Sequence, residues 1–145
     1  EWASYHLVEL NELAKAKNLK LVFTAGPSRR EQNHFEDLRN KVKGATFLPV
    51  VPELEQFIAI LSQCQAVISM DTSILHLAAG LGKPTVGIFG PTSSDRWAPL
   101  GVPHTSVQGS HCICSGHNES CDLQKSCIDS IQPKQVWDAF LKVCP

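Results

Sequence analysis

A chain of 145 residues can bury a substantial core but is short for a whole two-substrate enzyme, so we expect a single domain. The hydrophobic fraction of 43% and charged fraction of 19% are typical of a globular protein, and the formal net charge of −1 gives no electrostatic reason to expect nucleic acid as a partner. No apolar run of about 18 residues and no signal-peptide pattern is present, so we expect a cytoplasmic protein without a transmembrane segment.

Helices and strands alternate in the predicted order over the first 90 residues. Apolar residues at helical spacing, or short β-prone runs closed by turn residues, define each element. The predicted helices span about 4–17, 29–43, 53–63 and 72–81. The predicted strands span about 19–25, 46–48, 66–69 and 84–89. Ser4 is expected to cap the first helix, and the alternation predicts an α/β fold with a doubly wound parallel sheet.

Residues 90–130 differ in composition from the rest of the chain. They are rich in Gly, Pro, Ser and His, and only His104–Val107 is expected to form a short strand. A last helix is expected over Pro133–Val143, because Pro suits the first helical position and apolar residues recur along one side. The chain begins at Glu1 without an initiating Met, so we expect 1–145 to be a single domain from a longer protein.

The carboxyl ends of the predicted strands form the expected ligand site, because open parallel sheets bind ligands in the crevice there. Asp71, Thr72 and Ser73 lie between a strand and a helix, so the unpaired N–H groups and positive dipole end of that helix would attract an anion. His76 follows one turn later on the same face, where its imidazole can donate to a phosphate oxygen. The alternative is that Asp71 or Thr72 only caps the helix and His76 is packed in the interior.

Other loops at the same edge of the predicted sheet carry glycine. Gly26 follows the first strand, and Gly90, Pro91 and Thr92 follow the strand at 84–89. Glycine beside small hydroxyl residues lets the backbone approach a phosphate closely. These residues are therefore candidates for binding the same phosphate-containing ligand.

The segment from Val67 to Thr92 resembles the signature of glycosyltransferase family 9, the ADP-heptose:lipopolysaccharide heptosyltransferases. That pattern is a strand, Asp-Thr-Gly, a His three positions on, an Ala-rich helix, Lys-Pro, and a strand that ends in Gly-Pro-Thr. The chain matches it except at Ser73, where the family usually has Gly. Ala25–Pro27, Trp97–Gly101 and the cysteine-bearing tail also resemble the family, so the resemblance covers nearly the whole chain.

The resemblance implies the carboxyl-terminal half of a GT-B glycosyltransferase, in which two Rossmann-like domains face each other across a cleft. The full-length protein would then be a bacterial heptosyltransferase that transfers heptose from ADP-heptose to the lipopolysaccharide inner core. It would act at the cytoplasmic face of the inner membrane and require no cofactor. The acceptor and the general base would belong to the absent amino-terminal domain, so we expect no catalytic residue in this fragment and no transfer by the isolated domain.

The same resemblance assigns residues to an ADP-sugar donor. It places the diphosphate and the sugar at Asp71, Thr72, Ser73 and His76, and the nucleoside near Gly26. Glu31 is the nearest match to a family acid that contacts the ribose.

Two other functions remain open from the sequence. One is a non-catalytic module, either nucleotide- or phosphate-binding or clamped by its cysteines for interaction with a partner, with no transfer reaction. The other is a different GT-B sugar-nucleotide enzyme, such as an epimerase or a UDP-dependent transferase.

A Cys-rich irregular segment spans about 109–130. Four of its thiols, within sixteen residues, are candidate ligands of a structural zinc ion: Cys112, Cys114, Cys121 and Cys127. His111 and His117 are further candidate ligands. The spacing is not that of paired C-x2-C knuckles, so disulfides formed in a purified sample and free thiols remain alternatives.

Overall fold

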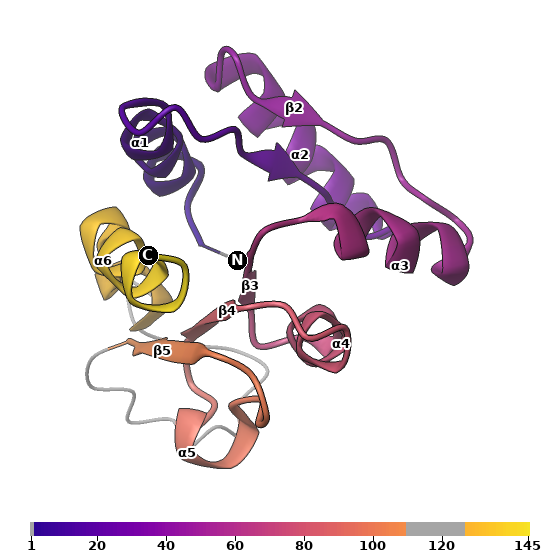
Figure 1. Ribbon diagram of the computed structural model, residues 1–145. Helices are drawn as coiled ribbons and strands as arrows, with labels where there is room; N and C mark the ends of the chain where they lie inside the picture. The colour runs from indigo at the N-terminus through magenta and orange to yellow at the C-terminus, as the bar shows by residue number, and fades with distance from the viewer. Residues whose placement is uncertain (1, 110–126) are drawn as a thin grey trace. The chain divides into compact units, whose positions relative to one another are not determined.

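The computed structural model describes residues 2–109 and 127–145 (Figure 1). The chain divides into two compact units, an amino-terminal unit over Trp2–Phe57 and a carboxyl-terminal unit over Ile58–Pro145. Helix α3 (Leu54–Gln63) contains the boundary between them. Each unit has its own parallel sheet, and the expectation that 1–145 is one domain stays a prediction.

The amino-terminal unit has two helices and a two-stranded sheet. Its elements are α1 (Ser4–Lys15), β1 (Val22–Phe23), α2 (Arg29–Lys41) and β2 (Thr46–Phe47). The two strands are parallel, with Phe23 opposite Phe47. The ring of Phe47 stacks on Phe23 at a centroid distance of 5.2 Å and meets the ring of Phe35 edge-on at 5.3 Å. Helix α2 therefore packs on the sheet that it connects, as a crossover between parallel strands requires.

Helix α1 begins at Ser4, but Ser4 does not cap it. The cap position belongs to Ala3, whose side chain makes no capping hydrogen bond. The Ser4 hydroxyl instead donates to Oδ2 of Asp37 at 2.8 Å and so ties α1 to α2. Hydrogen bonds from Lys41 and then Ser4 hold the pKa of Asp37 below its usual range. The predicted cap is wrong because the hydroxyl makes this tertiary contact.

The carboxyl-terminal unit is built on a three-stranded parallel sheet in the order β3-β4-β5. Its strands are β3 (Val67–Met70), β4 (Thr85–Phe89) and β5 (His104–Gln108). The central strand β4 is buried along its whole length, as its near-continuous apolar run predicts for a strand covered on both faces.

Helices cover both faces of this sheet (Figure 1). Helix α4 (Ser73–Gly80) packs against β3 and β4, and helix α6 (Pro133–Val143) packs against β4 and β5 on the opposite side. A short helix α5 (Ser94–Trp97) and a 3-10 turn η1 (Cys127–Ser130) lie in the region predicted to be irregular. In the described ranges, 2–109 and 127–145, no helix combines the length and the apolar character needed to cross a membrane.

Candidate functional site

The carboxyl end of β3 leads directly into α4. The N–H group of Asp71 donates to the carbonyl of Ile88 at 3.2 Å, so the pairing with β4 continues past the last residue of the strand. Thr72 then takes the cap position with extended backbone angles, φ −147° and ψ 169°. The strand pairing thus fixes where α4 begins, and the first turn of this helix points to the carboxyl edge of the sheet.

Thr72 occupies the cap position, but its side chain does not cap α4. Its hydroxyl instead pairs with the hydroxyl of Ser69 at 3.1 Å. Thr72 and Ser73 are both exposed. The amide groups of the first turn of α4 thus keep the partial positive charge that attracts anions, without a side-chain carboxylate or hydroxyl bonded to them as a cap.

His76 is exposed on α4, one turn after the cap. Residues four apart on a helix share a face, so its imidazole lies on the same side as Thr72. The alternative that His76 is packed in the interior is therefore wrong. The structure thus gives α4 an exposed start and an exposed imidazole one turn later, as the sequence predicts for a phosphate site.

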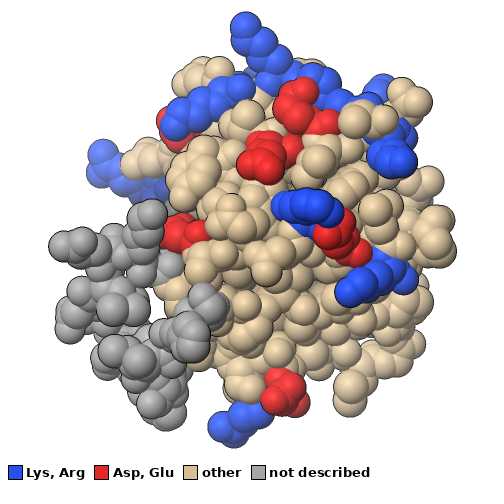
Figure 2. Space-filling view, turned by 90° about the vertical axis from the view of Figure 1, so that its left-hand side faces the viewer, with Lys and Arg blue, Asp and Glu red and all other residues tan. Residues whose placement is uncertain are grey.

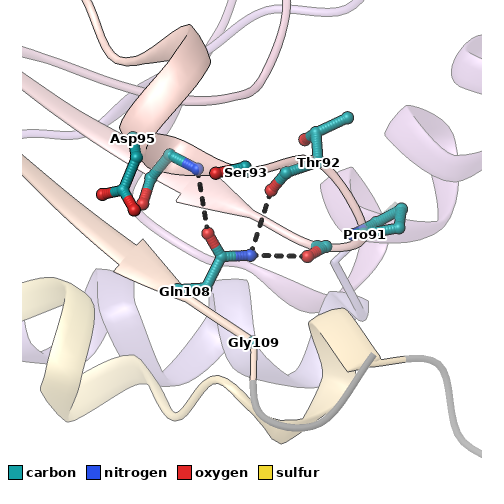
Figure 3. A pocket seen from close by; sticks show the side chains of 8 residues that line it. Pro91, Thr92, Ser93, Asp95, Gln108 and Gly109 are labelled. Carbon is teal, nitrogen blue, oxygen red and sulfur yellow. Dashed lines mark hydrogen bonds between the residues drawn. The ribbon is translucent and has the colours of Figure 1, made fainter. Parts of the chain in front are cut away.

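The neighbouring loop, after β4, borders a hollow of about 410 Å³ (Figure 3). The hollow is lined by residues 90–95 together with Gln108 and Gly109. Three of the predicted site residues, Gly90, Pro91 and Thr92, are thus part of its wall. Because Met70 pairs with Ile88 and Phe89 pairs with Gln108, the ends of β3, β4 and β5 reach this edge of the sheet together.

Gln108 is a residue of this edge that the sequence prediction missed. The predicted strand ended at Val107, but β5 continues to Gln108. The side-chain amide of Gln108 faces the loop after β4 (Figure 3), and its Nε2 donates to the carbonyl of Gly90 at 2.6 Å. A polar residue directly after a strand, at the edge where ligands bind, is the signal that could have identified it.

The remaining predicted residues, Gly26 and Glu31, belong to the amino-terminal unit. Ser28 caps α2 by accepting a hydrogen bond from the N–H of Glu31 at 3.2 Å, and its hydroxyl donates to the Glu31 carboxylate. Nε2 of Gln32 donates to the carbonyl of Gly26 at 2.6 Å. The loop after β1 and the first turn of α2 therefore form one hydrogen-bonded group that holds the Glu31 carboxylate beside Gly26.

A second histidine, His104, lies at the first position of β5. Its Nδ1 is 2.7 Å from the Thr85 hydroxyl and its Nε2 is 2.8 Å from the Ser106 hydroxyl. Burial lowers the pKa of His104, and the nearby charge of His76 lowers it further. His104 begins its strand, whereas the candidate site is at the strands' carboxyl ends, so we assign it to the support of the sheet.

The surface charge is mixed. Figure 2 shows Lys and Arg side chains interspersed with Asp and Glu on one face of the molecule, with uncharged areas between them. This distribution agrees with the formal net charge of −1. At the candidate site itself, the groups that can attract an anion are helix amides, hydroxyls and an imidazole.

The candidate zinc ligands fall mostly outside the described residues. Cys112, Cys114 and Cys121 lie there, as do His111 and His117. Cys127 is described, and it is a buried free thiol. Among residues 2–109 and 127–145, no group of three His, Cys, Asp or Glu side chains is placed to hold a metal ion. The structural zinc site stays a prediction.

A family model described as glycosyltransferase family 9 (heptosyltransferase) matches residues 1–128. The chain belongs to this family. Lipopolysaccharide heptosyltransferase 2 of Salmonella typhimurium is 28% identical over 143 residues, which cover 94% of this chain and 40% of that protein. Lipopolysaccharide heptosyltransferase 1 of Escherichia coli is 28% identical over 93 residues, which cover 63% of this chain and 28% of that protein. The chain thus spans well under half the length of these relatives.

Solved structures of the family share the fold. A glycosyl transferase family 9 protein from Veillonella parvula superposes with a TM-score of 0.83 at 16% identity, over 99% of this chain and 42% of that one. The E. coli heptosyltransferase WaaC with ADP superposes with a TM-score of 0.75 at 20% identity, over 95% of this chain and 38% of that one. The predicted fold class, a Rossmann-like α/β fold of the GT-B type, is confirmed.

Proposed function

We propose that this chain is the donor-binding part of a glycosyltransferase that transfers heptose from ADP-heptose to the lipopolysaccharide inner core. The observation that carries the proposal is the open first turn of α4, where Thr72 and Ser73 are exposed and His76 stands one turn away. Relatives named lipopolysaccharide heptosyltransferases support the reaction type. Solved family members with ADP and with ADP-2-deoxy-2-fluoro heptose support the donor class.

The helix start suits the leaving group of this reaction. When the bond between the sugar and the diphosphate breaks, negative charge grows on the departing phosphate. Fixed N–H groups at the start of α4 stabilise that charge more than they stabilise the bound donor, which lowers the barrier. His76 adds a further hydrogen-bond donor one turn along the helix. We propose that these groups supply the stabilisation that a metal ion supplies in other transferases.

Asp71 has a different role in this proposal. A carboxylate beside a diphosphate would be repelled, and Asp71 is tied to the sheet by the bond from its N–H group to Ile88. We assign Asp71 to orienting the loop between β3 and α4 or to a hydroxyl group of the donor sugar. In the amino-terminal unit, the Glu31 carboxylate beside Gly26 is the group proposed for the ribose.

The general base that activates the acceptor hydroxyl is assigned to a part of the protein outside this chain. The lipopolysaccharide acceptor would bind there as well, at the cytoplasmic face of the inner membrane. The residues of this chain then bind the donor, fix the direction of the diphosphate and stabilise its departure.

The test uses the full-length protein that carries this sequence, with ADP-heptose, UDP-sugars and GDP-sugars as donors and a heptose-free lipopolysaccharide as acceptor. We expect transfer from ADP-heptose alone. His76→Ala should lower kcat by on the order of 100-fold, as removal of one charge-stabilising donor does in other enzymes, and His76→Gln, which keeps an N–H donor, should lose less. Transfer from a UDP-sugar, or full activity in His76→Ala, would contradict the proposal.

A further inference from the structure

Gln108 is the last residue of β5 and lies opposite Phe89, the last residue of β4. From this position its side chain extends over the loop that follows β4 (Figure 3). The loop, residues 90–93, lies between β4 and α5, so it belongs neither to the strand nor to the helix. The N–H groups of Arg96 and Trp97 hold its last residue through the carbonyl of Ser93, and Gln108 supplies the further contacts along the loop.

One side-chain amide holds the loop at both ends. Nε2 of Gln108 donates to the carbonyl of Gly90 at 2.6 Å and to the carbonyl of Thr92 at 3.1 Å, with a longer contact to the carbonyl of Phe89 at 3.4 Å. Oε1 accepts a hydrogen bond from the N–H of Ser94 at 3.1 Å. A carboxamide has two N–H donors and a carbonyl oxygen with two lone pairs, so these contacts use both donors and one of the two acceptor positions.

These bonds also fix where the loop directs its donors. The C=O and N–H bonds of a trans peptide unit point in opposite directions, and the described residues contain no cis peptide. Because the carbonyl of Thr92 points at Gln108, the N–H of Ser93 points away from it. The bond from Gln108 to the Thr92 carbonyl therefore helps to fix the direction of the Ser93 N–H, which is a donor of this loop.

We infer that Gln108 is a positioning residue of the donor site. Its side chain holds residues 90–94 in the shape that binds the phosphates of an ADP-sugar. This inference rests on the proposed function. It goes beyond it because no predicted site residue explains how an irregular loop keeps a fixed shape beside a solvent-open hollow. Gln108 acts through the backbone of the loop, and the loop contacts the ligand.

Two substitutions separate this role from a general effect on folding. Gln108→Met keeps the length of the side chain but removes every hydrogen bond to the loop. Gln108→Glu keeps an acceptor for the N–H of Ser94 and sets a carboxylate oxygen against the carbonyls of Gly90 and Thr92. Gln65→Met is the matched control, because Gln65 is an exposed glutamine before β3.

The experiment measures three quantities in the full-length protein. Hydrogen–deuterium exchange of residues 90–95 without ligand reports the shape of the loop. The Kd values of ADP and adenosine report phosphate binding separately from nucleoside binding. The melting temperature reports folding.

We expect residues 90–95 to exchange faster in Gln108→Met and in Gln108→Glu than in the Gln65→Met control. We also expect both Gln108 variants to lose about tenfold in ADP affinity, which corresponds to about 1.4 kcal/mol. Adenosine affinity and the melting temperature should stay near the wild-type values. Unchanged exchange and unchanged ADP affinity in both variants would overturn the inference, as would equal losses for ADP and adenosine. If the wild type binds no ADP, the proposed function fails, while the exchange result still decides whether Gln108 holds the loop.

Discussion

The carboxylate of Glu31 occupies the space beside the Cα atom of Gly26. A Cβ atom at residue 26 would lie 2.5 Å from Oε1 and 2.8 Å from Oε2 of Glu31. The carboxylate is held there by the Ser28 hydroxyl. Gly26 therefore matters because it leaves room for an acid. The φ angle of Gly26 is not positive, unlike the φ angles of Gly44, Gly82 and Gly101.

Gly26→Ala should act through Glu31. The added methyl group pushes the carboxylate, at the end of a flexible side chain, away from Ser28, so stability should fall by about 1 kcal/mol or less. Adenosine affinity should fall as it does in Glu31→Ala. In a Glu31→Ala background, Gly26→Ala should have almost no further effect, because the displaced group is already gone. Calorimetric titration of the four proteins completes this cycle, and additive losses would contradict the mechanism.

Side chains pack closely around Gly87 on the face of the sheet that α4 covers. A Cβ atom there would lie 2.5 Å from Cε2 of Phe89, 3.0 Å from Cδ2 of Leu75 and 3.2 Å from Cε1 of His104. Gly87→Ala should lower the free energy of unfolding by about 1–3 kcal/mol, as overpacking a core does. Denaturant titration measures it.

Gly80 provides the matched control for that substitution. It ends α4, and a Cβ atom there meets nothing within 4 Å. Gly80→Ala should therefore leave stability unchanged or raise it by up to about 1 kcal/mol. Equal destabilisation by the two substitutions would show that packing at Gly87 is not the cause.

His104 should make stability fall on the acid side of neutrality. Burial, with a smaller contribution from His76, lowers its pKa in the folded protein. A histidine that is harder to protonate when folded stabilises the fold above the unfolded pKa of about 6.5, and this stabilisation is lost as the pH falls below that value. His104→Gln should flatten the decline between about pH 7 and pH 5. Unfolding free energies measured across this range would contradict the assignment if wild type and variant declined in parallel.

The order of elements could be predicted because it depends on local periodicity. The run at β4 is nearly all apolar, and α6 begins with Pro133, which suits the first position of a helix. Strand length was less predictable. The run at 19–25 is β-prone over its whole length, but only Val22 and Phe23 pair with a neighbouring strand, because the partner β2 is itself two residues long.

The candidate site was predictable where it follows from strand order, and not where it depends on tertiary contacts. Thr72, Ser73 and His76 are found by their place after a strand. Ser4 was assigned to a cap because nothing local reveals Asp37 on another helix. The place of Gln108 after the predicted strand marks it as a residue of the ligand edge, but its hydrogen bonds to the loop at 90–94 are tertiary contacts that the sequence does not reveal.

If the diphosphate binds at the start of α4 beside His76, ADP and adenosine should respond differently to the loss of His76. His76→Ala removes one donor to the phosphates, so it should weaken ADP binding by about tenfold or more, in the range of a hydrogen bond to a charged group. Adenosine, which lacks phosphate, should bind His76→Ala and the wild type equally well. Competition binding with the two ligands measures this, and a common loss would place His76 outside the phosphate site.

The most direct test of diphosphate binding at the open start of α4 is an ADP titration of the full-length protein, with its backbone amides followed by NMR. We expect chemical-shift changes at residues 25–28, 71–76 and 90–93, with the changes at the amides of Ser73 and its neighbours among the largest. Amides at the start of α4 that do not respond to millimolar ADP would contradict diphosphate binding there.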